Sequence, residues 1–138
     1  MKKYLIMLLM AFAFATTTNA QNVQWYKTTA YSIKKLNTDA YGNEVWGKWS
    51  DWEDSDMRVK FDLVNDVITI YSPKTQVYRV IRVEDTPYDS TGRQVKFKVI
   101  DQDGDYGYVR LRIENNGNSQ IYVDFRNVSW VYNVKRTS

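Results

Sequence analysis

The stretch QVKFKVIDQDGDYGYVRLRIE, residues 94–114, determines the fold class. Apolar residues alternate with lysines in 95–99 and with arginines in 109–113. Alternation with a period of two residues is typical of a β-strand that has one buried face and one solvated face. Between the two runs, residues 103–105 (DGD) favour a tight turn. The stretch therefore predicts an antiparallel β-hairpin.

The same alternation recurs along most of the chain after residue 22, and no window shows a sustained helical period. The predicted strands lie at residues 23–36, 44–53, 57–64, 67–72, 76–84, 95–99, 109–113 and 119–134. Short connections between consecutive strands favour an all-β, antiparallel up-and-down β-barrel of about eight strands, because closure leaves no exposed sheet edge. A two-sheet β-sandwich is the main alternative.

The last predicted strand contains a change of phase. Apolar residues occupy odd positions up to Phe125 and even positions from Val128 onward. One strand cannot keep both sets on its inner face without an additional residue. We therefore expect a β-bulge or a tight bend near residues 126–127, within a single bent strand.

A second local feature predicts a hairpin register. Asn65 and Asp66 separate two alternating runs, and both residue types tolerate the positive φ that a two-residue turn needs. Such a turn would pair Leu63 with Ile68 and keep both on the inner face.

The first twenty residues have the pattern of a secretory signal peptide. Lysines at 2–3 precede an apolar run at 4–15, and small residues occupy the −3 and −1 positions of a cleavage site that follows Ala20. The run is shorter than the roughly 20 apolar residues that a transmembrane helix needs. We therefore expect a helical signal peptide at 1–20, a single β-barrel domain at 21–138 without a membrane span, and a periplasmic or extracellular location.

Composition excludes several classes of function. The chain has 138 residues, no cysteine and no histidine, which excludes disulfides, zinc–thiolate sites and Ser-His-Asp or Cys-His catalysis. Two of the 19 basic residues lie in the predicted signal peptide, so 17 basic and 16 acidic residues remain, too balanced to attract a nucleic acid. Carboxylate-based hydrolysis at Asp51, Glu53, Asp54 or Asp56 is the remaining catalytic possibility. We expect a protein that is not an enzyme and has no cofactor.

Three tryptophans form the densest cluster of large aromatic residues: Trp46, Trp49 and Trp52. On a strand, the first and the third would share one face. They are candidates for a ligand platform that stacks on sugar rings, and the alternative is that at least two of them pack in the core. The spacing resembles the W-x-x-W-x-x-W of thrombospondin type 1 repeats, but those repeats are rich in cysteine. The triplet at 47–49 (GKW) resembles the G-x-W that begins the first barrel strand of lipocalins and their relatives, which implies a barrel that holds a small ligand.

Residues 101–107 (DQDGDYG) carry acidic side chains at alternate positions, as calcium-binding loops do. Tyr106 stands where such a loop has glycine, and Arg112 stands where it has a bidentate glutamate. A hairpin turn is the alternative, and we do not expect a bound metal.

Folding of the last hairpins predicts a basic stripe on the outer face. Turns at 103–105 and 116–118 would place Lys98 beside Arg110, and Arg110 opposite Asp124. The predicted partner-binding residues are Lys96, Lys98, Tyr108, Arg110, Arg112, Tyr122 and Arg126. This stripe could bind an acidic glycan, an acidic protein or an anionic membrane surface, and the alternative is an ordinary solvated face.

The sequence leaves three hypotheses for the function. The first is an exported, non-enzymatic β-barrel that holds a small molecule or a glycan in its interior or at its open end. The second is a protein–protein interaction or inhibitor module of the cell envelope that uses the basic stripe. The third is a hydrolase. A hollow interior would favour the ligand-holding barrel. A filled interior with an exposed aromatic patch would favour the protein–protein module. Two carboxylates about 5–10 Å apart in a cleft would favour the hydrolase.

Overall fold

The computed structural model describes residues 22–85 and 90–137 of the chain. Its elements are strands: β1 (Val23–Thr38), β2 (Glu44–Trp46), β3 (Glu53–Asp54), β4 (Arg58–Asp62), β5 (Val67–Ile70), β6 (Gln76–Asp85), β7 (Gly92–Ile100), β8 (Tyr106–Glu114), β9 (Ser119–Asp124) and β10 (Val128–Arg136). The predicted signal peptide lies outside the described residues. In the described ranges, no helix has the length and apolar character needed to cross a membrane.

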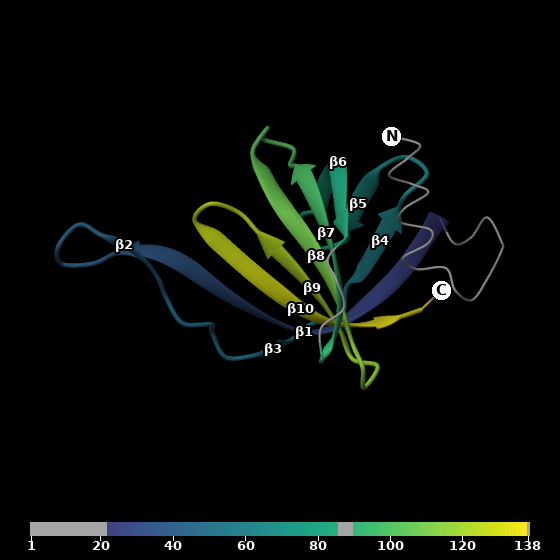
Figure 1. Cartoon of the computed structure of the whole chain (residues 1–138), viewed down its shortest axis with the longest axis horizontal. Coiled ribbons are helices and arrows are strands. Elements are labelled where there is room, and N and C mark those ends of the chain that lie inside the picture. The colour runs from purple at the N-terminus through teal and green to yellow at the C-terminus, as the bar shows by residue number, and fades with distance from the viewer. Residues whose placement is uncertain (1–21, 86–89, 138) are drawn as a thin grey trace.

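Eight of the strands form a closed antiparallel barrel (Figure 1). Neighbouring strands follow the order β10-β9-β8-β7-β6-β5-β4-β1, and β1 also pairs with β10, which closes the sheet on itself. Each barrel strand is a neighbour of the next barrel strand along the chain, so the topology is up-and-down. The predicted all-β barrel is confirmed, and closure excludes the two-sheet sandwich.

The number of barrel strands is as predicted, but two of the predicted strands, 44–53 and 119–134, do not form as expected. The predicted strand at 44–53 is not part of the barrel, because β2 and β3 are short and pair only with β1. The predicted bent strand at 119–134 is in fact two strands, β9 and β10, which pair with each other. Because Val123 lies opposite Trp130, odd residues of β9 and even residues of β10 face inward. The change of phase in the sequence therefore marks a hairpin turn, and the predicted bulge within one strand is wrong.

β1 closes the barrel with both of its edges. One edge pairs with β10 through nine residue pairs, and the other pairs with β4 through Val23–Lys27. The pairing with β10 skips Thr29, which forms a β-bulge. Because the bulge reverses which alternate residues face inward, Tyr26 and Tyr31 both contact the core.

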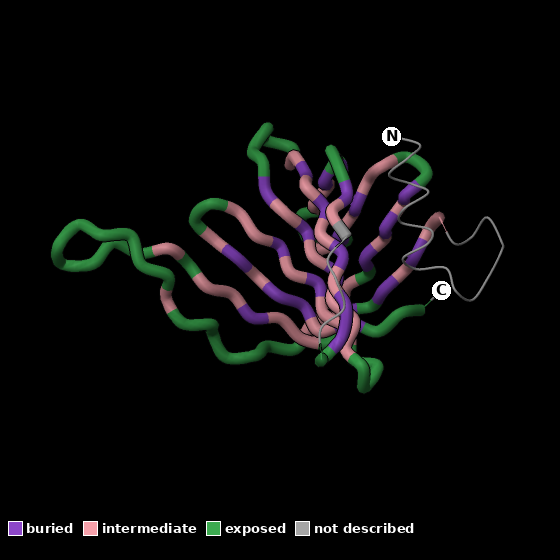
Figure 2. Tube along the Cα trace, viewed as in Figure 1, coloured by how far each residue is buried: buried purple, intermediate pink, exposed green. Residues whose placement is uncertain are grey.

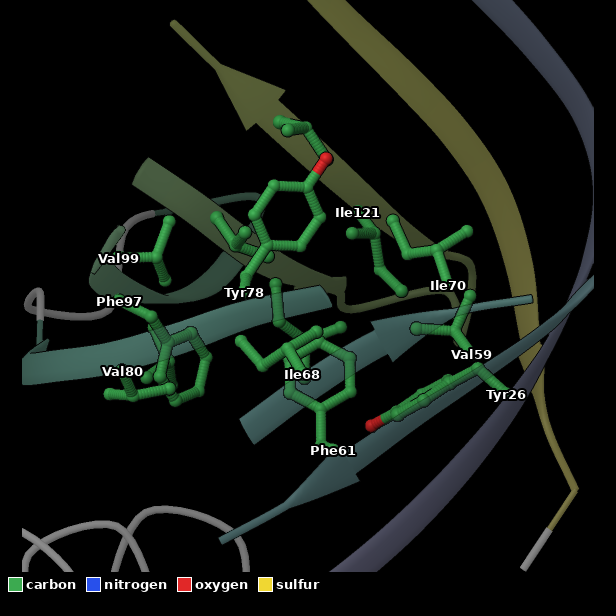
Figure 3. Close-up of a cluster of buried hydrophobic side chains, with 14 of the residues drawn as sticks. Tyr26, Val59, Phe61, Ile68, Ile70, Tyr78, Val80, Phe97, Val99 and Ile121 are labelled. Atoms are coloured by element: carbon green, nitrogen blue, oxygen red, sulfur yellow. The ribbon is translucent and has the colours of Figure 1, made fainter. Parts of the chain in front are cut away.

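Side chains pack the interior of the barrel (Figure 3). The rings of Phe61 and Phe97 lie 5.5 Å apart between centroids, and Tyr26 meets Phe61 edge-on at the same distance. Phe97, Leu111 and Val123, which alternation places on the inner face, are each at most 1% exposed. Figure 2 shows the resulting alternation of buried and less buried residues along the strands. Apolar side chains thus occupy the middle of the barrel, where a ligand chamber would otherwise lie.

The turn between β4 and β5 is longer than predicted. It spans residues 63–66, and Phe61 pairs with Ile68, whereas a two-residue turn would have paired Leu63 with Ile68. The register differs by two residues, so the predicted inner face is retained. Asp66 has a φ of 57°, the left-handed conformation that aspartate tolerates.

Beyond the barrel, β1 continues into a hairpin with β2, which extends to the left of Figure 1. We call this hairpin, residues 36–46, the arm. At its turn, Asp39 Oδ1 accepts hydrogen bonds from the amides of Tyr41 at 2.8 Å and Asn43 at 2.9 Å. Hydrogen bonds from Asn43 and then Tyr41 hold the pKa of Asp39 below its ordinary value. Hydrogen bonds therefore hold the turn of the arm in place, although most residues of the arm are exposed (Figure 2).

After the arm, residues 47–57 return along the edge of β1 that β4 leaves unused. The amide of Ser50, for example, donates to the carbonyl oxygen of Ile33 at 2.8 Å. The G-x-W triplet at 47–49 lies in this returning segment, after the first barrel strand has ended. The position that this motif has in lipocalins is therefore not reproduced.

Candidate functional site

The outer face of β7, β8 and β9 carries cations that lie over aromatic rings. The ammonium nitrogen of Lys96 lies 4.1 Å from the ring centroid of Tyr108, and the guanidinium carbon of Arg110 lies 4.2 Å from that of Tyr122. All four residues alternate with core residues along their strands and so point outward. At exposed positions such cation–π contacts each contribute about 0.5–1 kcal/mol. The predicted basic stripe is thus an ordered surface.

The register of the stripe differs from the prediction. Lys96, rather than Lys98, lies beside Arg110, and Lys98 lies beside Tyr108. The cause is the turn between β7 and β8, which occupies residues 101–105 instead of the three predicted residues. The longer turn moves the pairing by two positions, so the same side chains remain on the outer face.

Asp124 connects three strands of this face. It lies opposite Tyr108, and not opposite Arg110 as predicted, but its Oδ2 accepts a diagonal hydrogen bond of 2.5 Å from Arg110 Nε. Its Oδ1 accepts a hydrogen bond from Ser129 Oγ, also at 2.5 Å. Arg110 Nη1 in turn donates to Gln94 Oε1 at 3.3 Å. This network fixes the guanidinium that covers the ring of Tyr122.

Two predicted stripe residues lie at the edges of the surface. Arg112 donates a hydrogen bond to Thr91 Oγ1, toward the end of the barrel that holds the β8–β9 turn. Arg126 is exposed in the turn between β9 and β10, at the opposite end. The other five predicted residues lie side by side on the outer face of neighbouring strands. They are Lys96, Lys98, Tyr108, Arg110 and Tyr122.

The tryptophans are neither in the core nor on one strand. Trp46, Trp49 and Trp52 are 41%, 39% and 49% exposed, which contradicts the alternative that at least two of them pack in the core. Lys34 Nζ lies 5.2 Å from the ring of Trp46 and 4.7 Å from that of Trp49. Of the three tryptophans, Trp46 and Trp49 therefore share this cation.

Trp49 joins the tryptophans to the basic stripe. Its ring lies 6.3 Å from that of Tyr122, edge to face, although β1 and β10 separate the two segments. The intervening outward residue of β10 is Val131, which pairs with Tyr122 and is only 3% exposed. The indole thus crosses the outer face of β10, and the two predicted sites form one continuous surface.

A comparable cluster lies on the opposite side of the barrel. Trp25 stacks with Tyr71 at 6.0 Å, while Arg58 and Lys60 lie 4.3 Å and 5.4 Å from the Trp25 ring. β4 is four strands away from β8 in either direction around the barrel. This cluster provides a matched control for the basic stripe.

Aromatic side chains cover the end of the barrel near residues 101–105. The rings of Phe125 and Trp130 stack at 6.3 Å with an interplanar angle of 12°, and Tyr78 lies 6.0 Å from Phe125. Burial, followed by the neighbouring Tyr132 and Asp101, raises the pKa of Tyr78, so its hydroxyl stays protonated. We call this end, defined by Tyr78, Phe125 and Trp130, the mouth.

Three adjoining hollows run from the mouth over the rim of the barrel. The first two, about 470 and 430 Å³, share Tyr78, Asp101 and Trp130. The second also shares Phe125 and Arg126 with the third, which measures about 370 Å³. We call this path the rim groove. All three hollows have the size of ordinary ligand pockets, which is about 300–1,000 Å³.

The rim groove reaches the basic stripe. Its third hollow is also lined by Lys98, Tyr108 and Asp124, which belong to or contact the stripe. A larger hollow of about 650 Å³ lies at the other end of the barrel, beside Gln120 and Asn133. That hollow is lined by polar and aliphatic residues, without an aromatic ring for stacking. The rim groove is therefore the better candidate.

Sequence reasoning did not identify the mouth residues Tyr78, Phe125 and Trp130 as a site. The available signal was the change of phase after Phe125, because a turn at that position brings the ends of β9 and β10 together. The sequence prediction interpreted this change of phase as a bulge within one strand. Phe125 and Trp130 would then lie five residues apart along that strand, too far apart for their rings to stack.

The acidic residues that resembled a calcium-binding loop form a turn instead. Asp101 Oδ1 accepts the amides of Asp103 and Asp105, both at 2.9 Å, which makes the hairpin turn that was the alternative to a calcium loop. Asp56 pairs with Lys27 at 3.2 Å on the surface. Within residues 22–85 and 90–137, no group of three or more acidic, histidine or cysteine side chains is placed to hold a metal ion.

Comparisons with known proteins identify no relative: no family model, no curated protein and no solved structure matches this chain.

Proposed function

We propose that this protein is a non-enzymatic binding module that captures an acidic glycan on its outer face. The contact of Trp49 with Tyr122 carries the proposal, because it joins exposed tryptophans and the basic stripe in one surface. Four cations on this surface lie over aromatic rings: Lys34, Lys96, Lys98 and Arg110. Sugar rings stack on such aromatic faces, while the acidic groups of the glycan are attracted by the adjacent cations.

The packed interior supports a site on the outside. Phe61 and Phe97 meet in the middle of the barrel and are at most 1% exposed. An interior ligand would have to displace these rings, and closely packed protein interiors resist such changes. The interior version of the first hypothesis therefore loses its main physical basis, whereas a ligand at the open end remains compatible with the packed core.

The form of the surface favours a glycan over an acidic protein. The apolar groups are separate rings set among cations, and Trp46 and Trp49 are about two-fifths exposed. The centre of a stable protein interface is more continuous and apolar, with few charged residues. An acidic polypeptide is therefore the competing ligand that an experiment has to exclude.

Binding to polygalacturonate, dextran and polyglutamate tests the proposal. We expect calorimetry to detect binding of polygalacturonate that weakens with added salt, and to detect none of dextran. The double variant Lys96→Gln/Lys98→Gln should lower the affinity about tenfold, at up to about 1 kcal/mol for each of these partly exposed charges. The control Arg58→Gln/Lys60→Gln removes the matched pair on the opposite side and should change little. Equal losses in the two variants, or binding of polyglutamate instead of polygalacturonate, would overturn the proposal.

We also propose that the chain is exported and cleaved after Ala20, from the pattern of residues 1–20. The intact mass of the protein recovered from the periplasm or medium of an expressing bacterium tests this. The expected mass is that of residues 21–138. Recovery of the full-length chain from the cytoplasm alone would contradict export.

A further inference from the structure

The mouth combines a pair of stacked aromatic rings with ordered polar walls. Phe125 and Trp130 are nearly parallel, and both are only partly buried. Beside them, the Tyr78 hydroxyl donates to Gln76 Oε1 at 2.6 Å, and Gln76 Nε2 donates to Ser72 Oγ at 3.2 Å. The polar groups are therefore held in position beside the rings before any ligand arrives.

The charge of the mouth differs from that of the basic stripe. Its first two hollows are lined by three carboxylates, Asp101, Asp103 and Asp105, and by two cations, Lys74 and Arg126. Asp101 is oriented by two backbone amides at 2.9 Å. Carboxylates accept hydrogen bonds from hydroxyl groups but repel a sugar that carries its own carboxylate.

We infer that the mouth is a second subsite, which binds one uncharged, hydroxyl-rich sugar residue. Stacked aromatic rings beside the hollow, for the apolar face of the sugar, and carboxylate and amide oxygens around its hydroxyls fit this chemistry. The rim groove links the mouth to Lys98 and Tyr108 on the outer face. A glycan with both neutral and acidic residues thus lies with a neutral residue in the mouth and acidic residues along the stripe. Only the acidic part of this arrangement rests on the proposed function.

A neutral disaccharide tests the mouth by itself. In ¹H–¹⁵N spectra of the protein titrated with cellobiose, the Trp130 indole and Gly107 amide peaks should move to saturation. Phe125→Leu should abolish the shifts, and Asp105→Asn, which keeps the size of an exposed side chain, should weaken them several-fold. Tyr71→Leu removes a ring on the opposite side of the barrel and should leave them unchanged. Unmoved peaks, or equal shifts in Phe125→Leu and the parent protein, would overturn the inference.

Oligosaccharides of mixed charge test the link between the two subsites. Phe125→Leu should weaken the binding of a hyaluronan hexasaccharide, which alternates acidic and neutral residues, about tenfold, because one neutral residue stacks in the mouth. The same substitution should leave the affinity for hexagalacturonate nearly unchanged, whereas Lys96→Gln/Lys98→Gln should weaken both ligands. Cellobiose shifts without binding of any acidic glycan would refute the proposed function and leave the mouth subsite standing. Binding of hexagalacturonate without cellobiose shifts would refute the subsite alone.

Discussion

Gly107 of β8 provides the space that the Phe125 ring occupies. A methyl group at Gly107 would lie 2.8 Å from Cδ1 and Cε1 of that ring, and 2.6 Å from the carbonyl oxygen of Asp124. Carbon atoms do not approach this closely, so a side chain at position 107 would displace the ring or the strand. The aromatic stack of the mouth therefore depends on a residue that contributes no side chain to it.

Gly107→Ala should destabilise the fold and disturb the mouth. Overpacking of this kind typically costs about 1–3 kcal/mol. Urea denaturation should show the loss, and the Trp130 indole peak should move in the ¹H–¹⁵N spectrum because its stacking partner moves. An unchanged denaturation midpoint would show that β8 adjusts without cost.

Phe97→Ala should test whether the interior is a packed core. Phe97 contacts Phe61 and is fully buried, so its truncation should lower the free energy of unfolding by about 3–5 kcal/mol. The control is Tyr41→Ala at the tip of the arm, where the side chain is 90% exposed and the change should stay within about 0.5 kcal/mol. Similar effects at the two sites would argue against a packed interior.

Arg110 and Asp124 should be energetically coupled. Their side chains are each 28% exposed and are joined by a hydrogen bond of 2.5 Å between Nε and Oδ2. A double-mutant cycle with Arg110→Ala and Asp124→Ala should give a coupling energy of about 1 kcal/mol, the upper end for exposed pairs. Simple additivity of the two substitutions would mean that the pair does not order the stripe.

Tyr26 should make the fold sensitive to alkaline pH. Burial raises its pKa in the folded state to about 12, against an ordinary value of 10.0. Since the folded state prefers the protonated phenol, this contribution is complete below pH 10 and is lost as the pH rises toward 12. Denaturation between pH 8 and about 11.5 should show falling stability, with a smaller slope in Tyr26→Phe. Tyr41→Phe, at an exposed position, should keep the parent slope.

The barrel could be predicted because residue alternation reports burial directly. In 95–99 and 109–113, each apolar residue faces the core and each basic residue faces outward. Registers were less predictable, because a shift of two residues leaves every side chain on the same face. Phe61 opposite Ile68 and Lys96 opposite Arg110 are both displaced by this amount from the prediction. Turn length decides between such registers, and turn residues constrain it only weakly.

The candidate site could be predicted only in pieces. Alternation placed the stripe on the outer face, but it gave no position for Trp49 relative to Tyr122, which lie 73 positions apart in the sequence and meet across two other strands. The mouth depends on the hairpin between β9 and β10, which the sequence presented as a change of phase. Contacts of this kind arise from barrel closure, which local patterns do not contain.

The uninterrupted course of β1 from the barrel into the arm has a mechanical consequence. A force applied at the arm and directed along this strand would load its nine residue pairs with β10 in shear, so that many hydrogen bonds have to fail together. A force across the strand would instead open the pairs one after another. The barrel should therefore resist a force applied to the arm along β1 better than a force applied across β1.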